Sequence, residues 1–472
     1  MKQTDSATDD YDLIVIGGGA VGENVADYAT KRSLRVAIVE SDLVGGECSY
    51  WACMPSKALL RSGQALRAAR RLAGAREAVG ESVDVEAVLA RRTSFTSNWQ
   101  DDGQAEWVDS AGIDLIRGYG RLVGPGRVQV GERVYSARAV ALATGSSPVL
   151  PQIPGLDRAK PWGTREATAT DRVPERLIVI GGGVAGTELA LAFSSLGAQV
   201  SLLSRSTVLL AREEPFVGDY LADSLRDEGI DVRLGVTVAR VNRGEDGTVT
   251  VELEGGFQLH SDEVLVATGR QPNVRDLGLE TVGVDPNLTV DDTMLVSGTD
   301  WLYAVGDVNG RALLTHQGKY QARAAGEVIA ARLRGAPVRD APWGQHVATA
   351  DGPAVPRVVF TDPEIASVGL TERQARKAGA NVRAVEYDLG SVAGASLHAD
   401  GYAGHAKIVV DEDRGVLVGA TFLGQDVAEL LHSATIAIIG EVPIDRLWHA
   451  VPAYPTISEV WLRLLEAYGR PS

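Results

Sequence analysis

Cysteine is almost absent from this 472-residue chain, which contains only Cys48 and Cys53. Two cysteines cannot form the disulfide framework that stabilises small secreted domains. A single closely spaced pair in a long chain instead indicates redox chemistry in a reducing compartment, or else two inert buried thiols. The sequence around the pair has to decide between these interpretations.

Long apolar runs are also lacking. No stretch of about 18 apolar residues occurs, so no membrane span is expected. The first ten residues are polar and acidic and lack the apolar region of a signal peptide, so we expect a disordered tail. These features together favour a cytoplasmic protein.

Basic residues are fewer than acidic ones, 46 against 62, and the formal net charge is −16. This balance disfavours nucleic acid or an anionic membrane as a partner, although it allows a local basic pocket for an anionic cofactor. The hydrophobic content of 45% and charged content of 23% are ordinary for a globular protein. The length predicts two or three domains.

Two segments, 11–40 and 176–204, repeat one pattern: an apolar strand, a glycine-rich turn, a helix and a second apolar strand. This pattern predicts two βαβ units and therefore two dinucleotide sites. Each unit has a later apolar strand that ends in Ala-Thr-Gly, at 140–145 and 264–269.

The remaining sequence predicts additional helices and a separate C-terminal domain. Pro148, Pro151 and Pro154 suggest a boundary near 150–160. Helical periodicity marks 56–110. After about 345 we expect an α+β domain with strands at 358–360, 383–388, 406–410 and 416–422, and helices at 428–440 and 457–468. The predicted fold class is α/β, with two Rossmann-like domains and a C-terminal α+β domain.

The first dinucleotide motif consists of Gly17, Gly19 and Gly22, directly after a strand. Glycines in this pattern allow a tight turn and a close approach of the backbone to a pyrophosphate at the helix N-terminus. Glu40 ends the second strand, where a carboxylate can accept hydrogen bonds from ribose hydroxyls. The alternative is a purely structural glycine turn.

The second motif consists of Gly181, Gly183 and Gly186. Here the strand ends at Ser204, followed by Arg205. An acid at that position would repel a 2′-phosphate, whereas a hydroxyl beside an arginine accepts it, so the sequence favours NADPH over NADH. Arg212 is either a second contact to the phosphate or an exposed surface arginine.

The cysteine pair lies within the run Gly45–Lys57, shortly after Glu40. Five residues of regular helix rise about 7.5 Å, which exceeds the reach of a disulfide. A Cys48–Cys53 bond therefore requires an irregular first turn, which the preceding glycines allow. A disulfide accepts two electrons and so matches a flavin that carries a hydride equivalent.

The glycine motifs, Cys-x4-Cys-x-Pro-Ser-Lys, both Ala-Thr-Gly segments, Tyr303–Asp307 and Phe360–Gly369 together resemble the class I pyridine nucleotide–disulfide oxidoreductases. That family includes dihydrolipoamide dehydrogenase, glutathione reductase, mercuric reductase and soluble transhydrogenase. The resemblance covers the chain from about residue 11 onward.

The resemblance implies tight, non-covalent FAD, a pyridine nucleotide and a homodimer in which the C-terminal domain lends residues to the partner's active site. Cys53 would form the thiolate against the flavin, Cys48 would exchange with the acceptor, and Lys57 would pair with Glu188 near flavin N5. Thr144, Gly145, Gly269 and Asp307 would contact cofactors, with Asp307 at the ribityl chain. No resident metal is expected. The implied domains are FAD-binding (1–155 and 270–345), NAD(P)H-binding (156–269) and dimerisation (346–472).

The sequence departs from the family near its C-terminus. Disulfide-reducing members carry His-Pro-Thr with a glutamate five positions after the histidine, whereas here Glu459 is present but Tyr454 replaces the histidine. A tyrosine of pKa about 10 is a poor proton acceptor at neutral pH, and loss of a base typically costs about 10²–10⁴ in rate. His449 is a possible substitute, and Tyr454 is otherwise a packed interface ring.

Mercuric reductase and soluble transhydrogenase also carry tyrosine in this region, and the segment 203–215 resembles mercuric reductase. However, the C-terminal tail has no cysteine pair for Hg²⁺, and this chain keeps both redox cysteines, one of which soluble transhydrogenase usually lacks. We therefore expect an NADPH-driven flavoenzyme whose acceptor needs little proton abstraction, such as a quinone, a metal ion or a dye. The alternatives are a lipoamide-type disulfide reductase that tolerates Tyr454, a transhydrogenase-like activity, and a redox-sensing flavoprotein with slow turnover.

Overall fold

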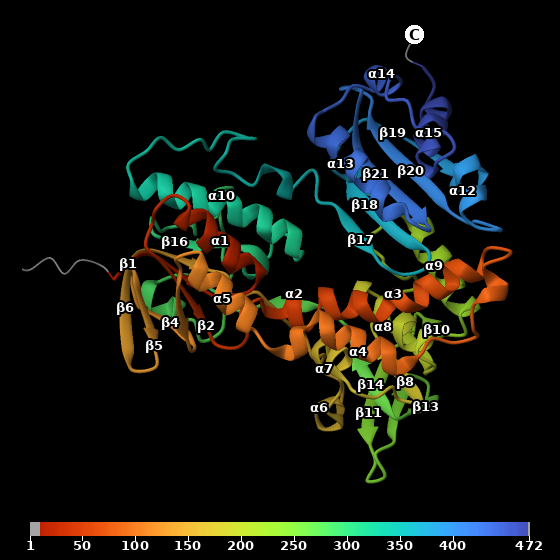
Figure 1. The fold of residues 1–472 in the computed structure, drawn as a ribbon, viewed down its shortest axis with the longest axis horizontal. Coiled ribbons are helices and arrows are strands. Elements are labelled where there is room, and N and C mark those ends of the chain that lie inside the picture. Colours follow the sequence, from red (N-terminus) through yellow and green to blue (C-terminus); the bar gives the residue numbers. More distant parts are fainter. Residues whose placement is uncertain (1–9, 471–472) are drawn as a thin grey trace, which may run out of the picture. The chain divides into compact units, whose positions relative to one another are not determined.

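The computed structural model describes residues 10–470, which divide into two compact units (Figure 1). The first unit contains residues 10–54, 93–147 and 270–351, and the second contains residues 55–92, 148–269 and 352–470. Helices α3 (Cys53–Arg70) and α4 (Val85–Phe95) each belong partly to both units. Each unit is built from segments that are far apart in the sequence.

The first unit is built on a seven-stranded sheet in which β1 is flanked by β2 and β6, and all three strands are parallel. Strands β3 and β16 extend the parallel part, and β5 and β4 add an antiparallel edge. Residues 13–16 of β1 form a continuous apolar run, because the sheet buries both faces of the strand there. The strands of this unit are β1 (Tyr11–Ile16), β2 (Val36–Glu40), β3 (Asp114–Arg117), β4 (Gly120–Gly124), β5 (Arg127–Val130), β6 (Arg133–Leu142), β7 (Ser146–Pro148), β15 (Arg270–Pro272) and β16 (Leu302–Ala304).

Helices α1 and α10 lie side by side in the first unit (Figure 1). Their alanine-rich faces share one buried cluster with the inner residues of β1, including Leu13 and Val15. No helix within residues 10–470 is both long and apolar enough to cross a membrane. The helices of this unit are α1 (Ala20–Thr30), α2 (Gly46–Tyr50), α5 (Asp102–Ser110) and α10 (Thr315–Leu333), with 3-10 turns at Ser97–Trp99, Leu279–Val282, Gly306–Asn309 and Thr349–Asp351.

The second unit contains a four-stranded parallel sheet in the order β10-β9-β8-β14, accompanied by a three-stranded antiparallel sheet, β11-β12-β13. Helix α8 is buried along most of its length, as its apolar sequence predicts. The elements of this part are β8 (Arg176–Ile180), β9 (Gln199–Ser204), β10 (Asp231–Leu234), β11 (Val238–Arg243), β12 (Val249–Leu253), β13 (Gln258–Ser261), β14 (Glu263–Val266), α6 (Leu156–Ala159), α7 (Thr164–Ala169), α8 (Val184–Ser195) and α9 (Pro215–Asp227).

The C-terminal part of the second unit is a five-stranded antiparallel sheet in the order β17-β18-β21-β20-β19, with α13 and α15 packed against it (Figure 1). Its elements are β17 (Arg357–Val359), β18 (Glu364–Gly369), β19 (Val382–Asp388), β20 (His405–Asp411), β21 (Val416–Gly424), α11 (Glu372–Lys377), α12 (Ala393–His398), α13 (Leu431–Ile439), α14 (Ile444–Leu447) and α15 (Val460–Tyr468). The predicted fold class is confirmed. Within this C-terminal sheet, β18 is the strand that periodicity did not predict.

Glu364, the first residue of β18, has a largely buried carboxyl group. The free-energy cost of burying this group depends on pH. Burial raises the pKa of Glu364 from 4.5 to about 7, and nearby Asp426 and Asp362 act in the same direction. Because the folded state then binds the proton more tightly than the unfolded state, stability falls as pH rises from about 4.5 to 7. The Glu364→Gln variant should therefore gain up to about 3 kcal/mol over wild type at pH 8 and little at acid pH, as measured by chemical unfolding. An equal gain at both pH values would contradict this assignment.

Candidate functional site

The first glycine turn is held against its neighbours so closely that side chains are excluded. A Cβ on Gly17, whose φ is +104°, would lie 2.4 Å from the carbonyl oxygen of Ala143, and one on Gly22 would lie 1.9 Å from that of Gly17. Helix α1 then starts after Gly19 without a side-chain cap, which leaves N–H groups at its N-terminus available to a ligand. The turn fits the pyrophosphate of a dinucleotide.

Glu40, at the end of β2, organises this turn. One carboxylate oxygen accepts the N–H of Gly18 at 2.6 Å, and the other accepts the N–H of Asp42 at 2.7 Å. A carboxylate has about four lone-pair directions, so both oxygens can still accept ribose hydroxyls. The structure therefore places Glu40 beside the glycine turn, as the motif predicts.

A second cluster of polar groups in the first unit surrounds Asp307. The Ser146 hydroxyl donates to Asp307 Oδ2 at 2.5 Å, and Arg270 Nε donates to Ser146 Oγ at 2.8 Å. Burial raises the pKa of Asp307. The neighbouring Thr144 is fixed by two hydrogen bonds with Asn273, of 2.7 and 2.9 Å, and a side chain on Gly145 would meet nothing within 4 Å. This open, polar surface fits the sugar-alcohol part of a flavin dinucleotide.

The cysteine segment begins against the first glycine turn. Gly45 and Gly46 have φ values of 108° and 61°, and a Cβ on Gly46 would lie 2.8 Å from the Cα of Gly19. Only glycine suits both backbone requirements. Cys48 consequently lies in the short helix α2, directly after a contact with the dinucleotide turn.

The irregularity that brings the two cysteines together lies between them and not at the preceding glycines. Helix α2 ends at Tyr50, Trp51 leaves the helical conformation with φ −137° and ψ −1°, and α3 begins at Cys53. The two cysteines are not joined by a disulfide in this structure. A hydrogen bond to Cys53, followed by burial, raises the pKa of Cys48, while Thr315 and Lys319 lower it.

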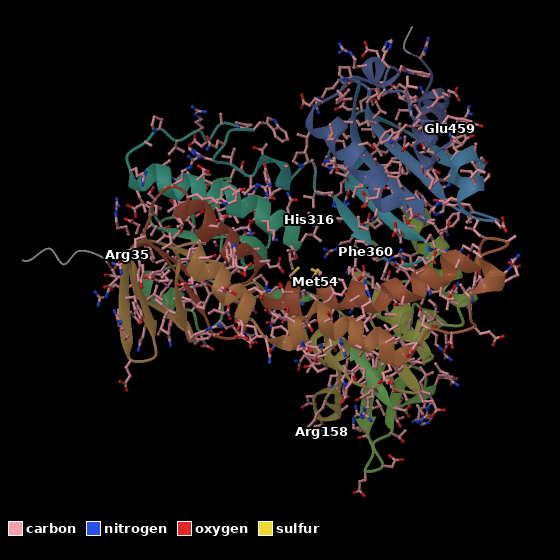
Figure 2. All side chains as sticks on the ribbon, viewed as in Figure 1. Arg35, Met54, Arg158, His316, Phe360 and Glu459 are labelled. Atoms are coloured by element: carbon pink, nitrogen blue, oxygen red, sulfur yellow. The ribbon has the colours of Figure 1, made fainter. Side chains whose placement is uncertain are left out.

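Cys53 also has a partner outside its own segment. Its Sγ lies 3.4 Å from Oγ1 of Thr315, the first residue of α10. Figure 2 labels the neighbours of these two residues, Met54 and His316, near one another. Sequence reasoning missed Thr315, because it lies 262 positions from Cys53 and belongs to no quoted motif.

In the second unit, Lys57 and Glu188 form an ion pair. Lys57 Nζ lies 2.6 Å from Glu188 Oε2, and the Glu188 side chain is only 3% exposed. The other oxygen of Glu188 accepts the backbone N–H of Phe360 at 2.9 Å, and Lys57 Nζ lies 5.1 Å from the centre of the Phe360 ring. Both oxygens of this buried carboxylate are thereby compensated.

The second glycine turn repeats the construction of the first. A Cβ on Gly181 would lie 2.3 Å from the carbonyl oxygen of Ala267, and one on Gly186 would lie 1.9 Å from that of Gly181. Helix α8 starts after Gly183 without a side-chain cap, and side chains on Gly183 and Gly269 would meet nothing within 4 Å. The structure therefore offers a second dinucleotide turn.

The end of β9 lies at this second turn. A Cβ on Gly182 would lie 2.8 Å from the hydroxyl of Ser204, and Ser204 is buried. Arg205 and Arg212 are both exposed. Exposure leaves both guanidinium groups accessible to a ligand.

The C-terminal residues do not form a base-and-carboxylate pair within the chain. Tyr454 is 76% exposed, and its hydroxyl has no hydrogen-bond partner among residues 10–470. His449 is also exposed. Glu459, labelled in Figure 2, is buried and binds Arg463 through Oε1 at 2.6 Å, while its Oε2 has no partner in the described chain. Arg463 was missed, although its position one helical turn after Glu459 is a signal for such a pair.

Family models match most of this chain. A model described as pyridine nucleotide-disulphide oxidoreductase matches residues 11–326, and the dimerisation domain of the same family matches residues 355–464. The chain belongs to the pyridine nucleotide–disulphide oxidoreductase family. It is thus an FAD-dependent oxidoreductase that uses a pyridine nucleotide, and its dimerisation domain supports a homodimer.

Individual relatives of this oxidoreductase differ in their named activities. Mercuric reductase from Staphylococcus aureus is 31% identical over 95% of this chain and 81% of its own length. Dihydrolipoyl dehydrogenase from Thermus scotoductus is 32% identical over 97% of both chains. The HOCl-induced flavoprotein disulfide reductase RclA from Escherichia coli is 26% identical, with a TM-score of 0.82 over 97% of this chain and 99% of its own.

Proposed function

We propose that this oxidoreductase carries electrons from NADPH to an acceptor through the thiols of Cys48 and Cys53, which form a disulfide when oxidised. The observation that carries the proposal is the hydrogen bond that the Cys48 thiol donates to Cys53, in a segment whose glycines lie against the first dinucleotide turn. When bound, FAD supplies the two-electron chemistry that links a nicotinamide to a disulfide.

The cofactors are assigned to the two glycine turns. The FAD-binding domain comprises 1–155 and 270–345, the NAD(P)H-binding domain comprises 156–269, and the dimerisation domain comprises 346–472. Residues that hold FAD are Gly17, Gly19, Gly22, Glu40, Thr144, Gly145 and Asp307, and those that hold NADPH are Gly181, Gly183, Gly186, Ser204, Arg205 and Gly269.

The two sulfurs have different tasks. Cys53 is the thiolate of the reduced pair, because it opens helix α3, where the N-terminal end of the helix favours negative charge, and because the Cys48 thiol and the Thr315 hydroxyl can both donate to it. Cys48 supplies the sulfur that either attacks the acceptor or delivers electrons to it. Closing the disulfide releases two electrons to the acceptor and the remaining thiol proton to solvent.

Lys57 and Glu188 serve the flavin end of the pathway. Their 2.6 Å ion pair fixes the partly exposed positive charge of Lys57 against the buried carboxylate of Glu188. A positive charge held near flavin N5 favours an anionic reduced flavin. We assign that role to Lys57, with Glu188 as the group that orients it.

NADPH is the preferred donor, because β9 ends at Ser204 and Arg205 follows it, so no acid is present there to repel a 2′-phosphate. The Arg205→Ala variant should lose about 10–100-fold in kcat/KM for NADPH and little for NADH, since a hydrogen bond to a charged group contributes about 1.5–3 kcal/mol. Steady-state kinetics with both nucleotides measure this change, and Arg240→Ala, at an exposed arginine on β11, is the matched control. Equal losses with NADPH and NADH would contradict the assignment.

The acceptor is a quinone, a metal ion or another group that takes electrons without a protein base. Support comes from Tyr454, which stands exposed in place of the family's histidine, and from Glu459, which binds Arg463 instead. RclA, a structural relative, is described in complex with Cu(II). The similarity to dihydrolipoyl dehydrogenase favours disulfide reduction as the second candidate.

Side-by-side NADPH oxidation with a naphthoquinone and with lipoamide separates these candidates. We expect the quinone to turn over, with lipoamide slower by about 10²-fold or more. Comparable rates with lipoamide would establish the second candidate and refute the account of Tyr454.

The protein works as a cytoplasmic homodimer, in which the dimerisation domain lends residues to the partner's active site. The cysteine usage and the net charge of −16 support this setting, without a nucleic-acid or membrane partner.

A further inference from the structure

One glutamine side chain binds both ends of the short turn that carries Asp307. Gln321 Oε1, on helix α10, accepts the backbone N–H of Gly306 at 2.7 Å and the side-chain amide of Asn309 at 2.8 Å. Gly306 and Asn309 are the first and last residues of the 3-10 turn in which Asp307 lies. A carbonyl oxygen has two lone pairs, so the turn uses both acceptor positions of Gln321 Oε1.

Gln321 is itself oriented by a buried carboxylate, that of Asp351. Gln321 Nε2 donates to Asp351 Oδ2 at 2.8 Å, and Gln317 Nε2, one helical turn earlier on α10, donates to Asp351 Oδ1 at 2.7 Å. The Asp351 side chain is 1% exposed and also lies 3.3 Å from Arg311 Nε. Because an ionised carboxylate only accepts and a backbone N–H only donates, one orientation of the Gln321 amide satisfies all of its partners.

The turn needs such a partner, because its own hydrogen bonds do not fix it. The N–H at the start of a helical turn has no acceptor within the turn, and Gln321 supplies one to Gly306. The Ser146 hydroxyl engages only Oδ2 of Asp307. The direction of the other carboxylate oxygen therefore follows from the backbone of the turn.

We propose that Gln321, oriented by Asp351, is a positioning residue for FAD: it fixes the turn so that the Asp307 carboxylate is already directed at the sugar-alcohol chain of the flavin dinucleotide before binding. The inference rests on the proposed assignment of Asp307 to FAD. A turn that is ordered in advance lowers the conformational entropy that binding has to remove.

Gln317 separates this positioning role from a role in packing alone. It is buried, lies on the same helix and binds the same carboxylate as Gln321. Within residues 10–470, however, no hydrogen bond joins its side chain to the turn at 306–309. If the network served only to hold Asp351 in place, the two glutamines would have the same effect on FAD.

The test is the rate at which the FAD-loaded holoenzyme releases FAD, followed by flavin fluorescence after dilution. Far-UV circular dichroism of the same samples shows that release occurs from folded protein. Gln321→Met should release FAD about 10-fold faster than wild type, which corresponds to the cost of ordering roughly one backbone residue on binding. Gln317→Met, the matched control, should stay within about threefold of wild type.

A double variant, Gln321→Glu with Asp351→Asn, moves the negative charge but keeps the hydrogen-bond pattern. The carboxylate introduced at position 321 still accepts from both donors of the turn. The amide introduced at position 351 donates to that carboxylate and accepts from Gln317, while Arg311 keeps its ion pair with Asp292 at 2.7 Å. This variant should release FAD within about threefold of wild type, and it decides the question if Gln321→Met does not fold.

The inference is overturned if Gln321→Met releases FAD no faster than Gln317→Met, or if the folded double variant releases FAD about 10-fold faster than wild type. A combination with Asp307→Ala adds a second criterion. Gln321→Met should not accelerate release further in that background, because both changes act on one contact. Additive losses would show that Gln321 supports the fold and not Asp307.

Failure of the proposed function would look different. Asp307→Ala alone would then release FAD at the wild-type rate, and the assignment of Asp307 to FAD would be wrong. Rapid release from Asp307→Ala, together with wild-type release from folded Gln321→Met, would leave that assignment intact and refute only the role of Gln321.

Discussion

The Cys53→Ser variant should lose about 10²-fold or more in acceptor turnover while it still binds FAD and NADPH. The serine hydroxyl cannot form a disulfide or a stable anion at neutral pH, so electrons can no longer be stored on the pair. The glycine contacts that fit a dinucleotide do not involve this side chain. Steady-state NADPH oxidation with a naphthoquinone measures the loss, and the flavin absorbance of the purified variant reports cofactor retention.

Ser49→Ala is the matched control, because Ser49 lies in α2 between the two cysteines and carries no thiol. It should keep turnover within about threefold of wild type. If Cys53→Ser reduces quinones as fast as Ser49→Ala does, electrons reach the acceptor without the cysteine pair, and the proposed path is wrong.

The second large effect concerns stability. Lys407 on β20 is buried and contacts three carboxylates, those of Glu214 at 3.1 Å, Glu372 at 2.8 Å and Glu386 at 3.0 Å. Burial alone would lower the pKa of Lys407, but the carboxylates outweigh it and the pKa is raised. Lys407→Met leaves Glu214, whose side chain is 2% exposed, without its cation, and should lower the free energy of unfolding by about 3–5 kcal/mol.

Chemical unfolding of the purified dimer measures this change, with Lys377→Met as control because Lys377 is exposed on α11. The control should change stability by less than about 0.5 kcal/mol. If Lys407→Met lowers the free energy of unfolding no more than Lys377→Met does, the network between β20 and the segment before α9 contributes nothing to stability.

Much of the fold follows from local patterns. The two βαβ units were predicted because the apolar strands and the glycine turn of each unit follow one another in the sequence, and because the whole pattern occurs twice. Three of the predicted C-terminal strands lie within two residues of β19, β20 and β21, and the segment 358–360 overlaps β17. Strand β18 escaped detection because five of its six residues are buried, so it shows no polar alternation.

The site was only partly predictable, for a physical reason. Motifs identify residues whose requirement is local, such as the glycines of both turns or Cys48 and Cys53. Contacts between distant segments leave no such trace: Thr315 meets Cys53 across 262 positions. Arg463 is the exception, since its spacing from Glu459 could have revealed the ion pair.

The most direct test of the central claim is an anaerobic titration of the purified, FAD-containing protein with NADPH. If the Cys48–Cys53 disulfide stores electrons in addition to the flavin, full reduction of the wild type consumes about two equivalents per flavin, and Cys53→Ser consumes about one. A wild-type protein that accepts only one equivalent, with both thiols already free to alkylation before NADPH is added, would contradict the account.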